Sequence, residues 1–175
     1  MLLKVCLLLF IQSTTNYIVV DISEQILLVY NSENFILKSY PISTSKYGIG
    51  NKANSNKTPI GKHIIANKIG HNAPIGTIFK ARINTGEIAT IYTDNTDKKE
   101  DLITSRILWL KGLENGTNSG KDIDSYNRFI YIHGTNEEGL IGKPASHGCV
   151  RMNNKDVIEL FKLIEEKTAV YIQEW

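Results

Sequence analysis

Short runs of β-forming residues, separated by turn residues, make up most of the chain after residue 15. The runs are rich in Ile, Val, Leu and Tyr, and Gly, Asn and Ser stand between them. This pattern predicts successive hairpins in a mainly β fold, an antiparallel sandwich or a barrel-like core. We expect strands at residues 17–22, 25–30, 35–44, 63–66, 77–82, 89–92, 107–110 and 128–133.

One segment near the C-terminus has the period of an amphipathic helix instead. Asn153 is a suitable N-cap, and Asp156 follows three residues later. An apolar face then recurs at helical spacing, made by Val157, Phe161 and Ile164. The sequence therefore predicts one supporting α-helix directly after the loop that carries Cys149, followed by a closing strand at residues 169–172.

Composition limits the number of domains and the classes of partner. The chain has 175 residues, of which 42% are hydrophobic and 22% are charged, as expected for one ordinary globular domain with a substantial core. Its net charge of +2 is too small for a nucleic-acid-binding protein, which concentrates lysine and arginine on one face. We therefore expect a single domain over residues 16–175 and no nucleic-acid partner.

The first residues resemble a minimal secretory signal. Lys4 precedes a short apolar run at residues 5–11, and polar residues 12–16 follow it. The run is too short to span a bilayer, which takes about 20 residues. No Ala-x-Ala cleavage site follows it, so an additional buried strand is the alternative. We expect residues 1–15 to be a leader that exports the protein to the periplasm.

Two of the four histidines and one of the two cysteines gather near the C-terminus. His133 ends the strand expected at residues 128–133, and segment 134–146, with its Gly and Pro residues, suits a loop that returns Cys149 to that strand end. A thiol has a reference pKa of about 8.5 and needs a base or a positive potential to act as a nucleophile at neutral pH. Because a histidine supplies both, we expect His133 to activate Cys149 and to lower the apparent pKa of this thiol.

The residues around Cys149 add further candidates. His147 and Cys149 are two residues apart, so their side chains share a face of an extended segment. Gly148 between them permits a sharp turn and a close approach of substrate. The backbone amides of Gly148 and Cys149 are then expected to form an oxyanion hole, an arrangement worth roughly 3 to 4 kcal/mol of barrier.

Other interpretations of these residues are weaker. A structural zinc site usually has four ligands in close spacing, whereas Cys149 and two histidines lack an obvious fourth, so we expect no metal. A buried, inert cysteine is common, but the neighbouring histidines and glycine-containing turns argue against it. The charged run at residues 98–101 is expected to be a solvated loop. The Gly- and Asn-rich segment 115–127 is expected to be a loop that borders the cleft.

The order of these residues resembles the active-site motif of the L,D-transpeptidase family, the YkuD-like catalytic domain of bacterial cell-wall enzymes. The similarity covers roughly residues 17–173, including the first hairpins. It rests on His133-Gly134, on Ser146-His147-Gly148-Cys149, on the basic Arg151 and on Thr58-Pro59-Ile60-Gly61. The resemblance implies a β-rich catalytic fold with helix support, and we expect it to need no cofactor.

This resemblance also implies a role for each residue. Cys149 is the nucleophile. His133 is the general base, oriented through its second ring nitrogen by a backbone carbonyl near Gly134. His147 helps to shape the oxyanion and acyl pocket. The residues that support the catalytic loop or bind a substrate carboxylate are Ser146 and Arg151.

The implied substrate is a peptidoglycan stem tetrapeptide, cleaved between an L-centre of diaminopimelate and the terminal D-alanine. Cys149 forms a thioester with the stem, and a side-chain amine of a neighbouring stem resolves it into a cross-link. Water as the acceptor would make the protein an L,D-carboxypeptidase. Two alternatives of other classes stay open, a wall-binding module without turnover and a cysteine peptidase for all-L peptides.

Overall fold

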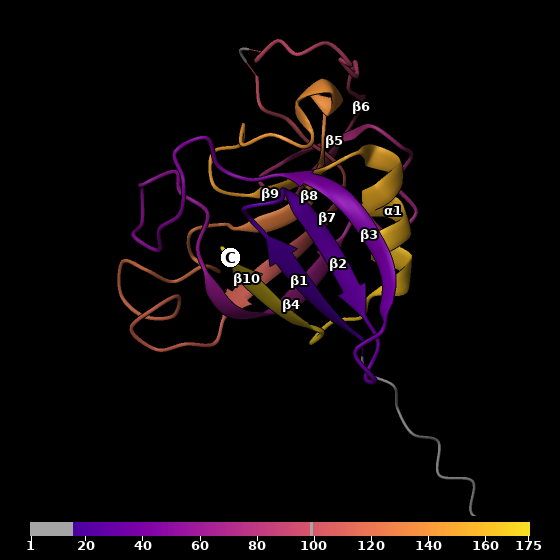
Figure 1. The fold of residues 1–175 in the computed structure, drawn as a ribbon. Coiled ribbons are helices and arrows are strands. Elements are labelled where there is room, and N and C mark those ends of the chain that lie inside the picture. Colours follow the sequence, from indigo (N-terminus) through magenta and orange to yellow (C-terminus); the bar gives the residue numbers. More distant parts are fainter. Residues whose placement is uncertain (1–15, 99) are drawn as a thin grey trace, which may run out of the picture.

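The computed structural model describes residues 16–98 and 100–175, and the leader expected at residues 1–15 lies outside them. Strands dominate the described part, which holds one α-helix after the Cys149 loop (Figure 1). The mainly β fold class with a supporting helix is therefore confirmed. The elements are β1 (Tyr17–Asp21), β2 (Ile26–Tyr30), β3 (Ile36–Ser43), β4 (Gly61–Ile69), β5 (Thr77–Lys80), β6 (Ile83–Ile88), β7 (Ile103–Gly112), β8 (Tyr131–Thr135), η1 (Glu138–Leu140), β9 (Val150–Met152), α1 (Asn154–Leu163) and β10 (Ala169–Gln173).

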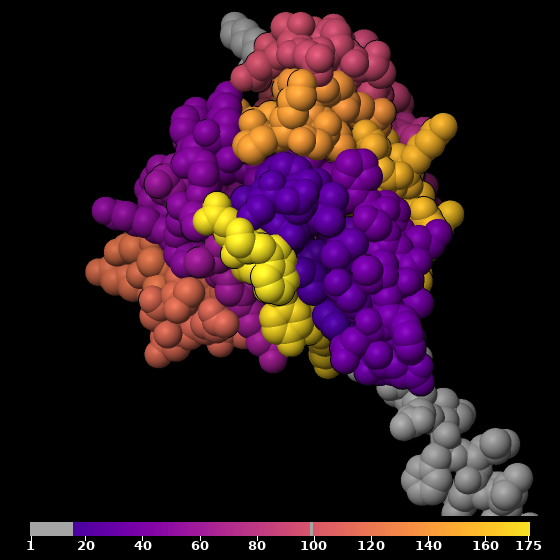
Figure 2. Space-filling view, in the orientation of Figure 1, coloured from indigo at the N-terminus to yellow at the C-terminus, as the bar shows by residue number. Residues whose placement is uncertain are grey.

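The strands form one mixed sheet in the order β4-β10-β1-β2-β3-β9-β8-β7-β5-β6. β4 also pairs with β7, so the strands from β4 to β7 in this order close into a ring, and the β5–β6 hairpin extends beyond it. Most neighbours are antiparallel, as expected, but β1 pairs with β10 and β8 with β9 in parallel. Figure 2 shows the C-terminal residues (yellow) beside the N-terminal residues of the described part (indigo), as the parallel pairing of β10 with β1 requires. The predicted antiparallel arrangement therefore holds for most of the sheet but not for these two pairs. In each pair, a long connection brings the chain back to run in the same direction.

Side-chain alternation along the strands builds the main core. The fully buried strand residues in it include Ile18, Val20, Leu27, Val29, Leu108, Leu110, Ile132, Val150 and Met152. α1 adds its apolar face, and the predicted residues Val157, Phe161 and Ile164 are all buried there. Asn153 is the N-cap residue, as predicted, but its side chain donates to Asp156 Oδ2 at 2.9 Å rather than capping the backbone.

Two short strands differ from the sequence prediction. β6 covers Ile83–Ile88, whereas the sequence predicts a strand at residues 89–92, where Tyr92 makes only an isolated bridge to Glu137. Every residue of β6 is exposed, so it has no apolar alternation to detect. β9 was not predicted, because three residues are too few to show a strand pattern. It is a strand through its pairing with β3 and β8. Within residues 16–98 and 100–175, no helix has the length and apolar character needed to cross a membrane.

We predict that Leu108→Ala lowers the free energy of unfolding by about 2 to 5 kcal/mol, because this leucine is fully buried and its loss leaves a cavity. Leu113→Ala is the matched control. Leu113 is 44% exposed, and we expect its loss to change stability by less than about 1 kcal/mol. Urea unfolding followed by circular dichroism measures both values. Equal losses in the two variants would contradict the assignment of Leu108 to the core.

Candidate active site

The parallel pair of β8 and β9 gathers the predicted residues. The register sets Ile132 beside Val150 and His133 beside Arg151. Since Ile132 and Val150 point into the main core, alternation turns the residues on either side of them to the opposite face. His133, Cys149 and Arg151 therefore share one face of the sheet.

Cys149 immediately precedes β9. Its Sγ accepts a hydrogen bond from Tyr131 N–H and donates one to the Phe129 carbonyl, each over 3.4 Å. The half-buried side chain packs against a small apolar cluster of Phe79, Ile107 and Tyr131. Burial raises the pKa of the thiol to about 12, outweighing the Tyr131 hydrogen bond, which lowers it. The expected lowering of this pKa is therefore wrong for the resting state, in which the site holds a neutral thiol.

His133 is 2% exposed, and its Nδ1 lies 2.7 Å from the Gly134 carbonyl oxygen. A carbonyl can only accept, so Nδ1 carries the proton of the neutral ring and Nε2 keeps a free lone pair. Burial lowers the pKa of His133, which favours this neutral form. The ring thus has the tautomer that a general base needs. Among the described residues, however, the hydrogen bonds of Cys149 Sγ go to Phe129 and Tyr131 and not to His133.

Gly134 stands where a side chain would not fit. A Cβ at this position would lie 2.7 Å from both Asn154 Oδ1 and the Thr104 carbonyl oxygen. Asn154 Oδ1 itself accepts hydrogen bonds from the hydroxyl groups of Thr104 and Ser105. The glycine therefore lets β8 approach both β7 and the start of α1, which holds in place the carbonyl that orients His133.

Ser146 braces the turn before Cys149. Its Oγ donates to the Cys149 carbonyl at 2.6 Å and accepts from Gly148 N–H at 3.2 Å. Gly148 has a φ of +126°, a conformation that side chains rarely adopt. The backbone amides of Gly148 and Cys149 were both expected to form an oxyanion hole. The Gly148 N–H is already bound to Ser146 Oγ inside the turn, whereas the Cys149 N–H does not make this bond.

The upstream segment Thr58-Pro59-Ile60-Gly61 is linked to the same turn. Thr58 is buried, and its Oγ1 accepts the Ser45 N–H at 3.0 Å. Ser45 in turn forms an isolated parallel bridge with Ser146. The segment therefore supports the turn through an intermediate residue.

Arg151 is fully buried and is held by two carboxylates. Its Nη1 lies 2.7 Å from Glu137 Oε2, and its Nη2 lies 2.7 Å from Asp101 Oδ2. Nη2 also donates to the Ala145 carbonyl at 3.0 Å. Asp101 Oδ2 lies 2.9 Å from His147 Nδ1 as well. A charge network thus joins His147 to Arg151 and ties the loop before Cys149 to β9.

Asp101 and Glu137 were not singled out from the sequence. The expectation that residues 98–101 form a solvated loop is wrong for Asp101, whose side chain is 25% exposed, forms an ion pair with Arg151 and lies within hydrogen-bond distance of His147. No local pattern marks either acid. Arg151 was the one residue that could have pointed to them, because a guanidinium that becomes buried needs carboxylate partners from elsewhere in the chain.

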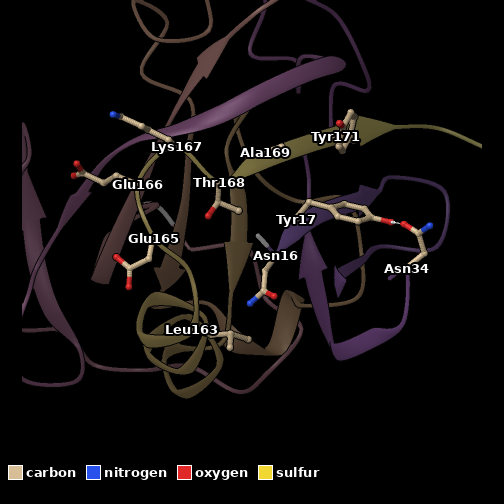
Figure 3. A pocket seen from close by; sticks show the side chains of 10 residues that line it. All are labelled: Asn16, Tyr17, Asn34, Leu163, Glu165, Glu166, Lys167, Thr168, Ala169 and Tyr171. Carbon is tan, nitrogen blue, oxygen red and sulfur yellow. Dashed lines mark hydrogen bonds between the residues drawn. The ribbon is translucent and has the colours of Figure 1, made fainter. Parts of the chain in front are cut away.

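A cavity of about 190 Å³ is lined by His147, Phe129, Arg128 and Asn127, among others. The end of the loop expected at residues 115–127 therefore borders it. A larger cavity, of about 870 Å³, lies between β1, β10 and the end of α1 and is lined by none of the candidate residues (Figure 3). Among the described residues, no group of three or more His, Cys, Asp and Glu side chains is placed to hold a metal ion.

Comparison with known sequences points to one family. The pattern of the family described as YkuD, L,D-transpeptidase catalytic domain, matches residues 15–172. The putative L,D-transpeptidase YkuD of Bacillus subtilis is 56% identical over 41 residues, which are 23% of this chain and 25% of that protein. The putative L,D-transpeptidase YqjB of the same organism is 49% identical over 45 residues, 26% of either chain. These matches thus span about a quarter of the relatives' length.

Solved structures show the same fold at low sequence identity. L,D-transpeptidase 3 from Mycobacterium tuberculosis, in complex with a faropenem-derived adduct, is similar with a TM-score of 0.56 and 14% identity, over 92% of this chain and 61% of that one. An L,D-transpeptidase from Mycobacterium smegmatis has a TM-score of 0.54 and 15% identity, over 91% and 59%. The family pattern covers most of the chain, and the fold agrees with it. The chain therefore belongs to the YkuD family of L,D-transpeptidase catalytic domains.

Proposed function

We propose that this chain is a peptidoglycan L,D-transpeptidase that works through a thioester on Cys149. The observation that carries the proposal is the placement of Cys149 and of a neutral His133, with Nδ1 tied to the Gly134 carbonyl, on one face of β8 and β9. Family membership supplies the reaction class. The proposed substrate is the stem tetrapeptide, with its terminal D-alanine as the leaving group.

In the proposed first step, His133 Nε2 takes the thiol proton while Sγ attacks the carbonyl carbon that precedes D-alanine. The C–N bond to D-alanine then breaks, the leaving nitrogen receives the proton from His133, and the thioester remains on Cys149. Because the resting Sγ donates to the Phe129 carbonyl, substrate binding has to turn the thiol toward His133. Burial keeps the thiol neutral, so proton removal and attack are coupled.

In the second step, a side-chain amine of a neighbouring stem attacks the thioester carbon. His133 accepts the amine proton and passes it to the departing sulfur, which restores the neutral thiol. Water in place of the amine gives an L,D-carboxypeptidase by the same route. A wall-binding module without turnover is less favoured, since nucleophile, base and both glycines, Gly134 and Gly148, are retained together.

The remaining residues position this pair. The Cys149 amide, joined by the Gly148 amide once Ser146 releases it, binds the developing oxyanion. His147 shapes the same pocket, and Asp101 holds its Nδ1. Arg151 secures the loop through its two carboxylates.

We also propose that the protein works in the cell envelope, because its substrate lies outside the cytoplasmic membrane. Residues 1–15 then act as the export signal, and residues 16–175 form the catalytic domain. Stem peptides are the proposed partners, with no part for nucleic acid.

Cys149→Ala is expected to abolish release of D-alanine from a defined tetrapeptide muropeptide. His133→Gln should slow it by at least about a hundredfold, the lower end of a general-base contribution. Mass spectrometry follows the loss of D-alanine and the appearance of cross-linked dimers. Cys6→Ser is the matched control and should behave as the unaltered protein.

The products separate the candidate activities. Loss of D-alanine with dimers supports transpeptidation, and loss without dimers supports carboxypeptidation. Wall binding without either product supports the binding module. Undiminished turnover by Cys149→Ala would rule out the cysteine mechanism.

Alkylation of Cys149 should report its raised pKa. In a Cys6→Ser background, we predict that the rate of reaction with iodoacetamide rises about tenfold per pH unit from pH 7 to pH 9 without a plateau. The sign follows from burial, which disfavours the thiolate and so moves its titration above that range. The urea-unfolded protein is the control and should titrate near about 8.5. A plateau near pH 7 would instead indicate a standing thiolate–imidazolium pair.

Asp101→Asn should lower kcat for D-alanine release by about tenfold, because the amide keeps the shape of the side chain but loses the charge that holds Arg151 and His147. Asp97→Asn is the control from the same segment. It removes an exposed ion pair to Lys46 and should leave kcat unchanged. Steady-state kinetics measures both, with melting temperatures recorded alongside. Equal kcat values in the two variants would refute the positioning role of Asp101.

A further inference from the structure

A third cavity, of about 760 Å³, lies where α1 ends, and none of the candidate active-site residues lines it. It is formed by the end of α1 and the turn that follows, by the end of β4 and by the bulge that interrupts β7 between Thr104 and Ile107. Cations outnumber anions among its lining residues. Its charged residues are Lys68, Arg106, Lys162 and Lys167, against Glu165 and Glu166.

Arg106 is the least expected of these residues, because it is a buried cation without an anion. The residue is 7% exposed. Its Nη1 donates to the carbonyls of Ala73 and Ser105 at 2.7 and 2.6 Å, and it forms no ion pair with any described residue. Residues 1–15 and 99 of this sequence contain no Asp or Glu that could serve it. By contrast, the equally buried Arg151 has two carboxylates.

Lys68 and Arg106 converge on one aromatic ring in the cavity wall. Lys68 Nζ lies 4.5 Å from the centroid of the Phe161 ring, and the guanidinium carbon of Arg106 lies 5.5 Å from it. The Lys68 ammonium also donates to the Ile164 carbonyl, and its side chain is 15% exposed. Glu165 compensates it weakly, at 3.9 Å, with a side chain that is 87% exposed. Two desolvated cations therefore face the same space with little neutralising charge.

We propose that this cavity binds a phosphate group, carried by a soluble phosphate ester or by an anionic lipid headgroup. The lysine, arginine and glutamate side chains of the lining give four cations against two carboxylates, an excess that matches the charge of about −1.5 to −2 on a phosphate monoester at neutral pH. A ligand with a single carboxylate carries one negative charge and would leave half of that positive excess unbalanced. Guanidinium and ammonium donors also suit the several acceptor oxygens of phosphate.

The test measures binding of glycerol 3-phosphate by isothermal titration, at an ionic strength held constant with sodium chloride. In parallel, cosedimentation compares vesicles that contain phosphatidic acid, a lipid with a phosphate monoester headgroup, with vesicles of phosphatidylcholine. Arg106→Gln and Lys68→Gln should each weaken binding of whichever phosphate probe the protein prefers by about tenfold, since each removes a charged donor. Lys121→Gln, an exposed lysine outside the cavity, removes the same charge and should not change binding.

Melting temperatures show which variants fold, and Lys68→Gln keeps the test decisive if Arg106→Gln does not fold. Binding of the soluble ester that falls in the variants identifies the first source, and binding restricted to vesicles with phosphatidic acid identifies the second. The proposal is overturned if neither probe binds the unaltered protein, or if Lys68→Gln binds as tightly as Lys121→Gln. Release of D-alanine is not part of this readout, so the outcome is independent of the proposed enzymatic function.

Discussion

The parallel pairing of β8 with β9 is the constraint on which the candidate site depends. It places His133 beside Arg151, and it holds Cys149 just before the start of β9, next to Tyr131. The register is secured from the core side, because Val150 is fully buried against Ile132. A slip of one residue would move the core residues of β9 to the site and the site residues into the core. Hydrophobic packing on one face thus specifies the positions of reactive groups on the other.

Buried charge then fastens the loop to that strand. Burying a guanidinium is costly unless carboxylates accompany it, and breaking a buried pair typically costs about 3 to 5 kcal/mol. Glu137 and Asp101 come from segments on opposite sides of β7 and β8 in the chain, and both reach Arg151. The two ion pairs of Arg151 therefore join three segments at the site. Asp101 also contacts His147, which links the loop before Cys149 to the same group.

The same burial gives the site a neutral resting state. Burial raises the pKa of Cys149 and lowers that of His133, so both groups lose their charged forms. A neutral thiol is a poor target for oxidation and alkylation, whereas a standing thiolate would be exposed to both. In the proposed mechanism, ionisation of the thiol is then confined to the moment of attack, when substrate and base are both in place. The β7 bulge separates this region from the cationic cavity, because Ile107 lies opposite His133 while Arg106 lines the cavity.

The mainly β class, the helix after Cys149 and the candidate residues of the site could be predicted from the sequence, because alternation, helical spacing and a compact His-Gly and Ser-His-Gly-Cys order are local features of the chain. Four features could not be predicted in this way and depend on the folded chain: the parallel strand pairs, the short strand β9, the carboxylates that meet Arg151 and the direction of the thiol pKa shift. Each of these depends on which distant segments come into contact and on how much water their contact excludes. A local sequence pattern contains neither kind of information.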